Sequence, residues 1–158
     1  MLEGLRGAAL LVPDAFDCAV PEVAWQRYGK IDEASYDFAD VELPITNAMI
    51  ERAATQLERK LHVRSTRLMR LRAGDYALAH HDRFHEDNPV ELTLDLSPMS
   101  VPGAEIHYRR RGNVFFRVPC EPRILAIVER GPTVSCNHTY ISKLTPDALV
   151  IRYVVLAA

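Results

Sequence analysis

Cysteine is scarce in this chain, and long apolar runs and an excess of charge of one sign are missing altogether. The 158 residues include only Cys18, Cys120 and Cys136, which are widely spaced and form no CxxC pair. Their small, odd number argues against a disulfide framework and fits a reducing compartment. The formal net charge is −2, so the overall charge indicates neither a nucleic-acid partner nor an anionic membrane.

The chain also lacks recognisable targeting segments. Residues 1–16 are only briefly apolar and carry Glu3 and Arg6, so they lack the apolar core and cleavage pattern of a signal peptide. No apolar run approaches the roughly 20 residues that a membrane span needs. We therefore expect a cytoplasmic protein, and the length predicts a single domain over residues 1–158.

What is present is one helical pattern followed by many short β patterns. Residues 44–61 repeat apolar side chains every four positions and predict a helix, with Thr46 or Asn47 as its cap. Residues 8–16, AALLVPDAF, predict a short strand that stops at Pro13, and residues 17–43 show no clear pattern. The later segments, separated by Pro, Gly, Asn and Asp, predict about eight short strands: 63–74, 75–82, 90–98, 104–110, 113–119, 123–131, 133–143 and 148–158. The expected fold is mainly β, a barrel or jelly roll with a helical buttress.

The stretch GDYALAHHD, residues 74–82, places imidazoles beside a carboxylate at the end of one predicted strand. Side chains alternate between the faces of a strand, so His80 and Asp82 share one face and His81 takes the other. His138, in a later predicted strand, is a candidate third ligand. Two histidines and one carboxylate on one face of an octahedral ion suit non-haem Fe(II) and leave positions open for a co-substrate and O2.

Other histidine patterns have simpler explanations. An HxD pair is common by chance on protein surfaces. His81 and His85 are four residues apart and can share a zinc ion if they lie on a helix. Pro89 and the polar residues before it favour a loop instead, and no cysteine pair completes a zinc site. His62 and His107 belong to no ligand pattern.

Arg152 lies in the middle of ALVIRYVVLAA, an apolar segment at residues 148–158. Burying an unpaired guanidinium is very costly, so Arg152 needs an anion or a path to solvent. A salt bridge to an Asp or Glu of the protein is the simpler explanation. The alternative is a small-molecule carboxylate inside the barrel, because the guanidinium fork matches a carboxylate bidentately.

Taken in order, these segments resemble the Fe(II)- and 2-oxoglutarate-dependent oxygenases of the prolyl-hydroxylase-like kind. The resemblance starts near LLVPDAF and covers most of the chain, with its core in RLRAGDYALAHHD, LTLDLSPMSVPGAEIHYR, PRILAIVERGP, NHTYIS and IRYVVLA. It implies a double-stranded β-helix fold, with His80, Asp82 and His138 holding Fe(II) and Arg152 binding the distal carboxylate of 2-oxoglutarate.

The same resemblance implies oxidation by O2 with 2-oxoglutarate as co-substrate, most simply hydroxylation of an sp³ carbon. A tyrosine or hydroxyl that helps to hold 2-oxoglutarate is not singled out: the candidates are Tyr76, Thr93, Tyr108 and Tyr140. Lys143 and Arg123 are alternative anion partners.

The substrate class follows from the short length, which leaves little chain for a lid. An open site suits an amino acid displayed on a peptide, a protein or a carrier, and a small amino-acid-like substrate would need a dimer partner or residues 83–90 to cover it. The basic run Arg109–Arg111 either steers an acidic substrate or forms a solvated turn. The rival functions are a non-catalytic metal- or ligand-binding β-barrel, and a cupin-like metalloenzyme that does not use 2-oxoglutarate.

Overall fold

The computed structural model describes residues 7–12, 18–79, 89–131 and 133–158. These residues form one helix and an antiparallel sheet of eleven strands. In chain order the elements are β1 (Gly7–Leu11), β2 (Gln26–Lys30), β3 (Ala34–Ala39), α1 (Thr46–Leu57), β4 (Val63–Arg72), β5 (Tyr76–Ala77), β6 (Val90–Asp95), β7 (Glu105–Arg110), β8 (Asn113–Pro119), β9 (Ile124–Glu129), β10 (Val134–His138) and β11 (Leu149–Ala157).

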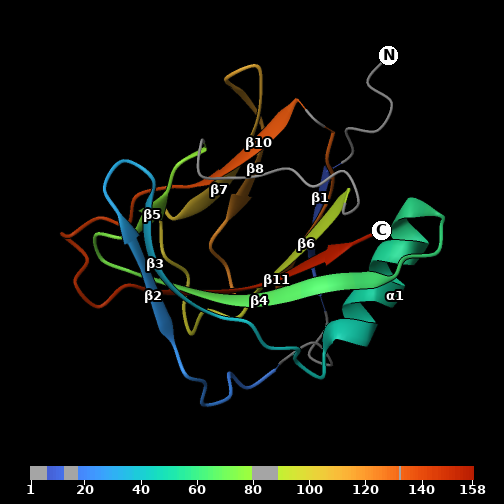
Figure 1. Ribbon diagram of the computed structural model, residues 1–158, viewed down its shortest axis with the longest axis horizontal. Helices are drawn as coiled ribbons and strands as arrows, with labels where there is room; N and C mark the ends of the chain where they lie inside the picture. Colours follow the sequence, from blue (N-terminus) through green and yellow to red (C-terminus); the bar gives the residue numbers. More distant parts are fainter. Residues whose placement is uncertain (1–6, 13–17, 80–88, 132) are drawn as a thin grey trace.

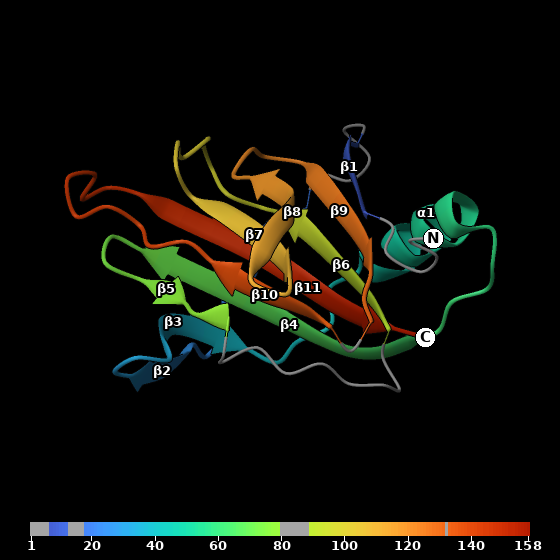
Figure 2. The ribbon, with the colours of Figure 1, turned by 90° about the horizontal axis from the view of Figure 1, so that it is seen from above.

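The strand order shows a jelly roll. Two groups of four strands, β9-β6-β11-β4 and β5-β10-β7-β8, are joined by β3, which pairs with both β4 and β5. From β4 to β7 each strand lies in the opposite group from the one before it. After the β7–β8 hairpin, β9, β10 and β11 again change group each time. Figure 1 shows the two groups curving around a common interior, and Figure 2 shows the long β4 and β11 side by side. The expected fold class is confirmed.

The helix lies outside the barrel, against the β9-β6-β11-β4 group (Figure 1). Alternation along β11 sends Tyr153 and Val155 to the helix side, where they pack with Met49 of α1. The opposite face of β11 carries Val150 and Arg152 into the barrel. The helix thus covers the outside of the sheet that carries Arg152, as a buttress would.

The helix is shorter than its periodicity suggested, because it spans Thr46–Leu57 and not residues 44–61. The predicted cap is wrong: Ile45 occupies the N-cap without a side-chain hydrogen bond. Thr46 Oγ1 instead donates to the Leu43 carbonyl at 2.6 Å. The helix ends where Glu58 adopts φ 54°, in the left-handed region. Among the described residues no helix is long and apolar enough to cross a membrane.

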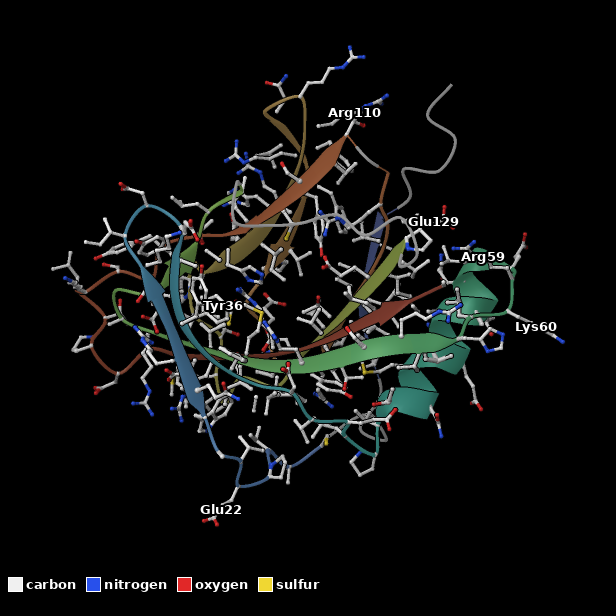
Figure 3. The ribbon with its side chains drawn as sticks, viewed as in Figure 1. Glu22, Tyr36, Arg59, Lys60, Arg110 and Glu129 are labelled. Atoms are coloured by element: carbon white, nitrogen blue, oxygen red, sulfur yellow. The ribbon has the colours of Figure 1, made fainter. Side chains whose placement is uncertain are left out.

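The hairpin of β2 and β3 fills the region that showed no clear sequence pattern. Along β3, Ala34, Tyr36 and Phe38 pack into the barrel, and Tyr36 projects from β3 into its interior (Figure 3). The alternate positions Ser35 and Asp37 face the other way and carry polar bonds. Charged outward positions of this kind dilute the apolar signal of a strand, which is why the hairpin was not expected.

Candidate functional site

His138 ends β10 and lies on the face of that strand that lines the barrel. It is paired with Ala77 of β5 on one side and with Ile106 of β7 on the other, and both partners are buried apolar residues. The next residue, Thr139, makes two hydrogen bonds to the backbone of Glu105. Its backbone N donates to the Glu105 carbonyl at 2.9 Å, and its Oγ1 accepts from Glu105 N at 2.8 Å. These bonds fix where β10 ends and therefore where the imidazole sits.

Arg152 lies in the barrel interior with 1% of its surface exposed. Its Nη1 is 2.8 Å from His138 Nδ1, and its Nη2 donates to the Ala104 carbonyl at 3.3 Å. Burial lowers the pKa of Arg152, although the guanidinium remains protonated at any ordinary pH. Two residues that the sequence analysis selected on separate grounds are thus in direct contact, fourteen positions apart in the chain.

The contact fixes the tautomer of His138. A guanidinium only donates, so Nδ1 accepts, and a neutral imidazole then carries its proton on Nε2. A metal bound at Nδ1 would take the lone pair that Arg152 uses. A metal bound at Nε2 would move the proton to Nδ1, where it would face the guanidinium donor. The hydrogen bond and metal ligation by His138 therefore exclude each other, and a bound metal would release Arg152 to another acceptor.

Asp95 ends β6 directly opposite Arg152 in the β6–β11 pair. Its Oδ1 accepts from Ser97 N at 2.8 Å, whereas its Oδ2 is buried and has no hydrogen-bond partner among the described residues. Burial raises the pKa of Asp95 and lowers that of Arg152, and each outweighs the opposing effect of the other charge. Both shifts have the sign of burial and not of a close ion pair. Arg152 and Asp95 therefore face each other across the β6–β11 pair without a hydrogen bond between them among the described residues.

A second polar group lines the same interior farther along β6. Glu91 binds the Tyr108 hydroxyl and forms an ion pair with Arg130 at 3.4 Å. Arg130 Nη2 also donates to the Val134 carbonyl at 3.0 Å. Burial raises the pKa of the Tyr108 phenol well above its usual value, with the nearby Glu91 charge as the next cause. Here the two buried charges, Glu91 and Arg130, form an ion pair, whereas Asp95 forms none with Arg152 among the described residues.

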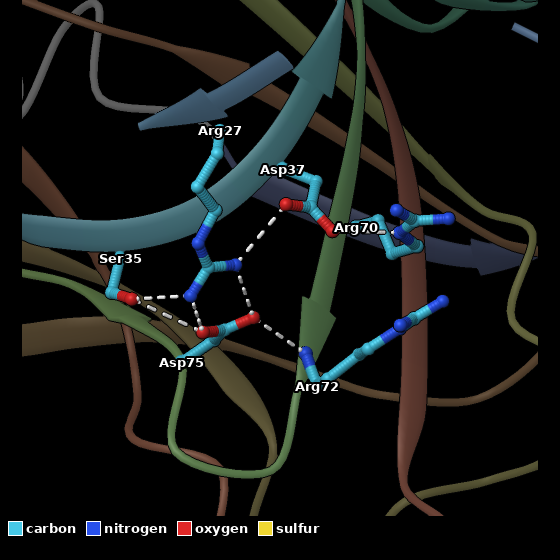
Figure 4. Close-up of polar contacts among 6 residues, drawn as sticks. All are labelled: Arg27, Ser35, Asp37, Arg70, Arg72 and Asp75. Atoms are coloured by element: carbon cyan, nitrogen blue, oxygen red, sulfur yellow. Dashed lines mark hydrogen bonds and ion pairs between the residues drawn. The ribbon is translucent and has the colours of Figure 1, made fainter. Parts of the chain in front are cut away.

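A network on the outer side of the barrel holds the start of β5 (Figure 4). Asp75 follows the turn at Gly74, where φ is 91°. Its carboxylate accepts from both Nη1 and Nη2 of Arg27, at 3.1 and 2.6 Å, and from the backbone N of Arg72 at 2.8 Å. Asp37 bridges Arg27 to Arg70. The network ties β2, β3 and β4 to the strand that leads into the HxD stretch.

Of the proposed metal ligands, the structure describes His138, whereas His80 and Asp82 lie outside the described residues, as do His81 and His85. Within 7–12, 18–79, 89–131 and 133–158, no three His, Cys, Asp or Glu side chains gather as a metal site would require. The assignment of the iron ligands therefore stays a prediction, and it rests on His138.

The candidates for holding 2-oxoglutarate lie in different places. The rings of Tyr76 and Tyr140 contact each other, with centroids 6.4 Å apart, and Tyr140 is half exposed. Tyr76 alternates with the inward-facing Ala77, so it lies on the other face of β5. Thr93 is buried two residues before Asp95, on the same face of β6. Asp95 itself was missed, although an aspartate inside the apolar LTLDLS poses the same question as Arg152.

The remaining cationic candidates are at the surface or held by the turn structure. Lys143 is exposed and packs near Gly74. Arg123 is half-buried, and its backbone N donates to the Asp95 carbonyl at 2.9 Å. In the basic run, Arg109 donates to Asn137 and to the Gly112 carbonyl, and Arg111 is exposed in the β7–β8 turn. The run therefore spans the end of β7, with Arg109 and Arg110 half-buried, and only Arg111 lies in the exposed turn.

Several solved structures resemble this one, and some of them are named as oxygenases. An oxidoreductase of the 2OG-Fe(II) oxygenase family from Burkholderia pseudomallei superposes with a TM-score of 0.62 at 10% identity, covering 92% of this chain and 76% of that one. A prolyl-4-hydroxylase from Pseudomonas putida gives 0.61 at 12% identity, covering 99% and 92%. AviO1 from Streptomyces viridochromogenes Tue57 gives 0.63 at 13% identity, covering 98% and 89%.

The chain has the fold of the 2OG-Fe(II) oxygenases. These neighbours include a prolyl hydroxylase among other members, so the likeness supports this oxygenase fold without selecting a branch. No protein-family model matches the sequence, and no curated protein matches it either. At such low identities the likeness establishes the fold, and the activity has to be argued from the residues themselves.

Proposed function

We propose that this protein is an Fe(II)- and 2-oxoglutarate-dependent dioxygenase that hydroxylates an sp³ carbon of an amino-acid-like, peptidyl or protein substrate. The observation that carries the proposal is the contact between the buried Arg152 and the half-buried His138 inside the barrel. It joins a candidate metal ligand to a candidate carboxylate receptor, and these are the two kinds of group that a metal-chelating oxoacid needs.

His80, Asp82 and His138 would hold the iron. Ala77 is paired directly with His138 and precedes His80 by three residues, which span at most about 11 Å. The HxD stretch is therefore within reach of the imidazole. Nitrogen and carboxylate donors suit Fe(II). Because metal ligation by His138 breaks its hydrogen bond with Arg152, His138 would bind the metal while Arg152 would bind the co-substrate. On the described side the donor is the imidazole of His138, a group that suits Fe(II).

Arg152 would bind the distal carboxylate of 2-oxoglutarate. Its fork presents several donors, of which one now contacts His138 and another the Ala104 carbonyl. When bound, iron supplies the O2 chemistry that oxidises a C–H bond while 2-oxoglutarate is decarboxylated to succinate and CO2. The chain itself orients the co-substrate from β11 and surrounds the site with buried apolar side chains of β3, β4 and β10, which exclude water.

The same residues define how the rival functions differ. A non-catalytic barrel could keep a metal for stability, and a cupin-like enzyme would bind metal without needing Arg152. In both cases the buried guanidinium would require a carboxylate of the protein as its partner. Among the described residues Arg152 bonds to an imidazole and a backbone carbonyl, and Asp95 lies opposite without a bond to it. This arrangement favours a ligand anion.

The test is succinate formation by the purified protein with Fe(II), O2 and 2-oxoglutarate, against a panel of amino acids, peptides and cell extract. We expect succinate above the level without protein, with a further increase when the substrate is present. Binding of 2-oxoglutarate to the Mn(II)-loaded protein, measured by calorimetry, gives a second readout independent of turnover. Metal-dependent binding without turnover would favour the non-catalytic alternative, and the absence of binding would contradict the oxygenase proposal.

A further inference from the structure

Asp95 Oδ2 is the one buried carboxyl oxygen among the described residues that has no hydrogen-bond partner. Asp95 faces Arg152, the proposed receptor of the distal carboxylate. It is 4% exposed, lies opposite Arg152 across the β6–β11 pair, and shares its face. Directly opposed side chains in an antiparallel pair are about 5 Å apart at Cβ, so a ligand group held by Arg152 meets Asp95.

The orientation of this carboxyl is fixed by its neighbours. Ser97 N binds Oδ1 at 2.8 Å, and Ser97 Oγ accepts from Ile151 N at 2.9 Å, which ties the turn after β6 to β11. Cys120, whose thiol is 3.5 Å from Ser97 Oγ, is a further titratable group beside Asp95, and Cys136 and Tyr108 act on Arg152 from the facing strands. Burial and the Asp95 charge raise the pKa of the Cys120 thiol, so it stays neutral. With Oδ1 bound to Ser97, the buried Oδ2 is left without a partner among the described residues, and Arg152 is the facing charge.

The charges of Arg152 and Asp95 determine how this site would receive a dicarboxylate. Arg152 and an ionised Asp95 already balance, so a second carboxylate would leave one negative charge uncompensated in a buried site. Two carboxyl groups that share one buried site bind a proton between them, because both cannot remain ionised at close range. The pKa of Asp95 is already raised by burial before any ligand is present.

We propose that Asp95 takes up one proton when 2-oxoglutarate binds, and donates it in a hydrogen bond to the distal carboxylate that Arg152 holds. The inference rests on the proposed function and adds to it a residue that determines specificity. The proton comes from solvent, and the complex then contains Arg152 and the ligand carboxylate as a balanced pair beside a neutral acid. The site would therefore select a distal group that accepts from both Arg152 and Asp95.

The proton uptake sets a direction for the pH dependence. The pKa of Asp95 is higher in the complex than in the free protein, so affinity is greatest at low pH and falls as pH rises between the two values. Within that interval the association constant falls by up to about tenfold for each pH unit, since one proton is bound per ligand. Above the higher pKa the affinity levels off.

The experiment is calorimetry on the Mn(II)-loaded protein with 2-oxoglutarate, at several pH values and in pairs of buffers with different ionisation enthalpies. The dependence of the heat on the buffer gives the number of protons taken up, and we expect close to one within the interval. Pyruvate is the matched ligand control, because it has the metal-chelating oxoacid and lacks the distal carboxylate. It should bind without this uptake.

The variant Asp95→Asn keeps the shape and a hydrogen-bond donor but does not titrate. We expect it to bind 2-oxoglutarate with no proton uptake and little pH dependence, whereas Glu91→Gln, a buried carboxyl on the same face of β6, should behave like the wild type. The proton count in the wild type needs no variant, so a folding defect cannot hide the answer. Binding of 2-oxoglutarate without uptake, or uptake that persists in Asp95→Asn, would overturn the inference. Absence of any 2-oxoglutarate binding would instead overturn the proposed function beneath it.

Discussion

Replacing Arg152 separates co-substrate binding from metal binding, because the two depend on this side chain in opposite ways. The guanidinium is buried at 1% exposure and is the cation that would face the distal carboxylate. Removing one partner of a buried charge pair costs on the order of 2–5 kcal/mol. At about 1.4 kcal/mol per tenfold, we expect Arg152→Ala to weaken 2-oxoglutarate binding by about thirty to several thousand fold.

The metal should respond differently. His138 loses its 2.8 Å hydrogen bond from Arg152 in this variant, and that bond has to break before His138 can ligate a metal. Removing a competing interaction leaves metal affinity unchanged or tighter. The assay is calorimetric titration with Mn(II) and then with 2-oxoglutarate, for wild type, Arg152→Ala and Arg152→Lys. The lysine variant should rescue co-substrate binding only in part, because it keeps the charge and loses the fork.

The control for general damage is Arg130→Lys, which alters another buried arginine whose partner is Glu91. We expect it to leave the affinity for 2-oxoglutarate close to that of the wild type. The reasoning would be refuted if Arg152→Ala kept its full 2-oxoglutarate affinity, which would move the anion site to another cation such as Lys143 or Arg123. It would also fail if metal and co-substrate affinity fell together in a folded variant.

Three further predictions address positioning, stability and reaction outcome. Asp75→Asn should loosen the start of β5 and weaken Mn(II) binding, which metal titration measures. The free energy of unfolding, measured by urea denaturation, should fall by on the order of 1 kcal/mol, because the partner Arg27 is half exposed. Tyr153→Phe removes the buried hydroxyl that accepts from the backbone before α1, so stability should fall by about 1–3 kcal/mol in urea denaturation while 2-oxoglutarate affinity is retained. With Asp82 filling its place on the iron, mass spectrometry should find one oxygen from labelled O2 in the product, less any exchanged with water, and no chlorine even with chloride present.

The sequence predicted best those strands whose inner and outer positions differ in chemistry. Along β8 exposure alternates from residue to residue, and the sequence NVFFRVP follows this alternation except at Phe115, which is apolar and exposed. The β2–β3 hairpin was not predicted, because its polar side chains are explained only by partners that are distant in the sequence. Arg27 and Asp75 are 48 positions apart, and nothing local indicates that they meet.

The candidate site was predictable to the extent that it depends on single residues out of character with their surroundings. Arg152 in an apolar strand drew attention for that reason, and its burial is now evident. Asp95 is equally out of character, but its importance comes from the β6–β11 register, which places it opposite Arg152. The contact with His138 likewise depends on how the two strand groups face each other. Register and sheet facing are tertiary properties that periodicity alone does not contain.

The choice between the adjacent histidines depends on where a strand stops. Ala77 faces the barrel interior and pairs with His138, so unbroken alternation from Ala77 would carry His81 inward. The prediction of His80 and Asp82 as the inward pair therefore needs the alternation to reset. In the structure β5 ends at Ala77 after only two residues, which provides the place for such a reset.

We expect His80→Ala to abolish tight Co(II) binding and His81→Ala to retain it, as measured by titration of the metal's absorption bands and by the metal content of the purified protein. Each variant serves as the other's control, since the two remove the same group one position apart. If His81→Ala abolished binding while His80→Ala did not, the alternation begun at Ala77 would continue through the stretch. The ligand assignment would then be wrong by one residue, and Asp82 would lose its role with His80.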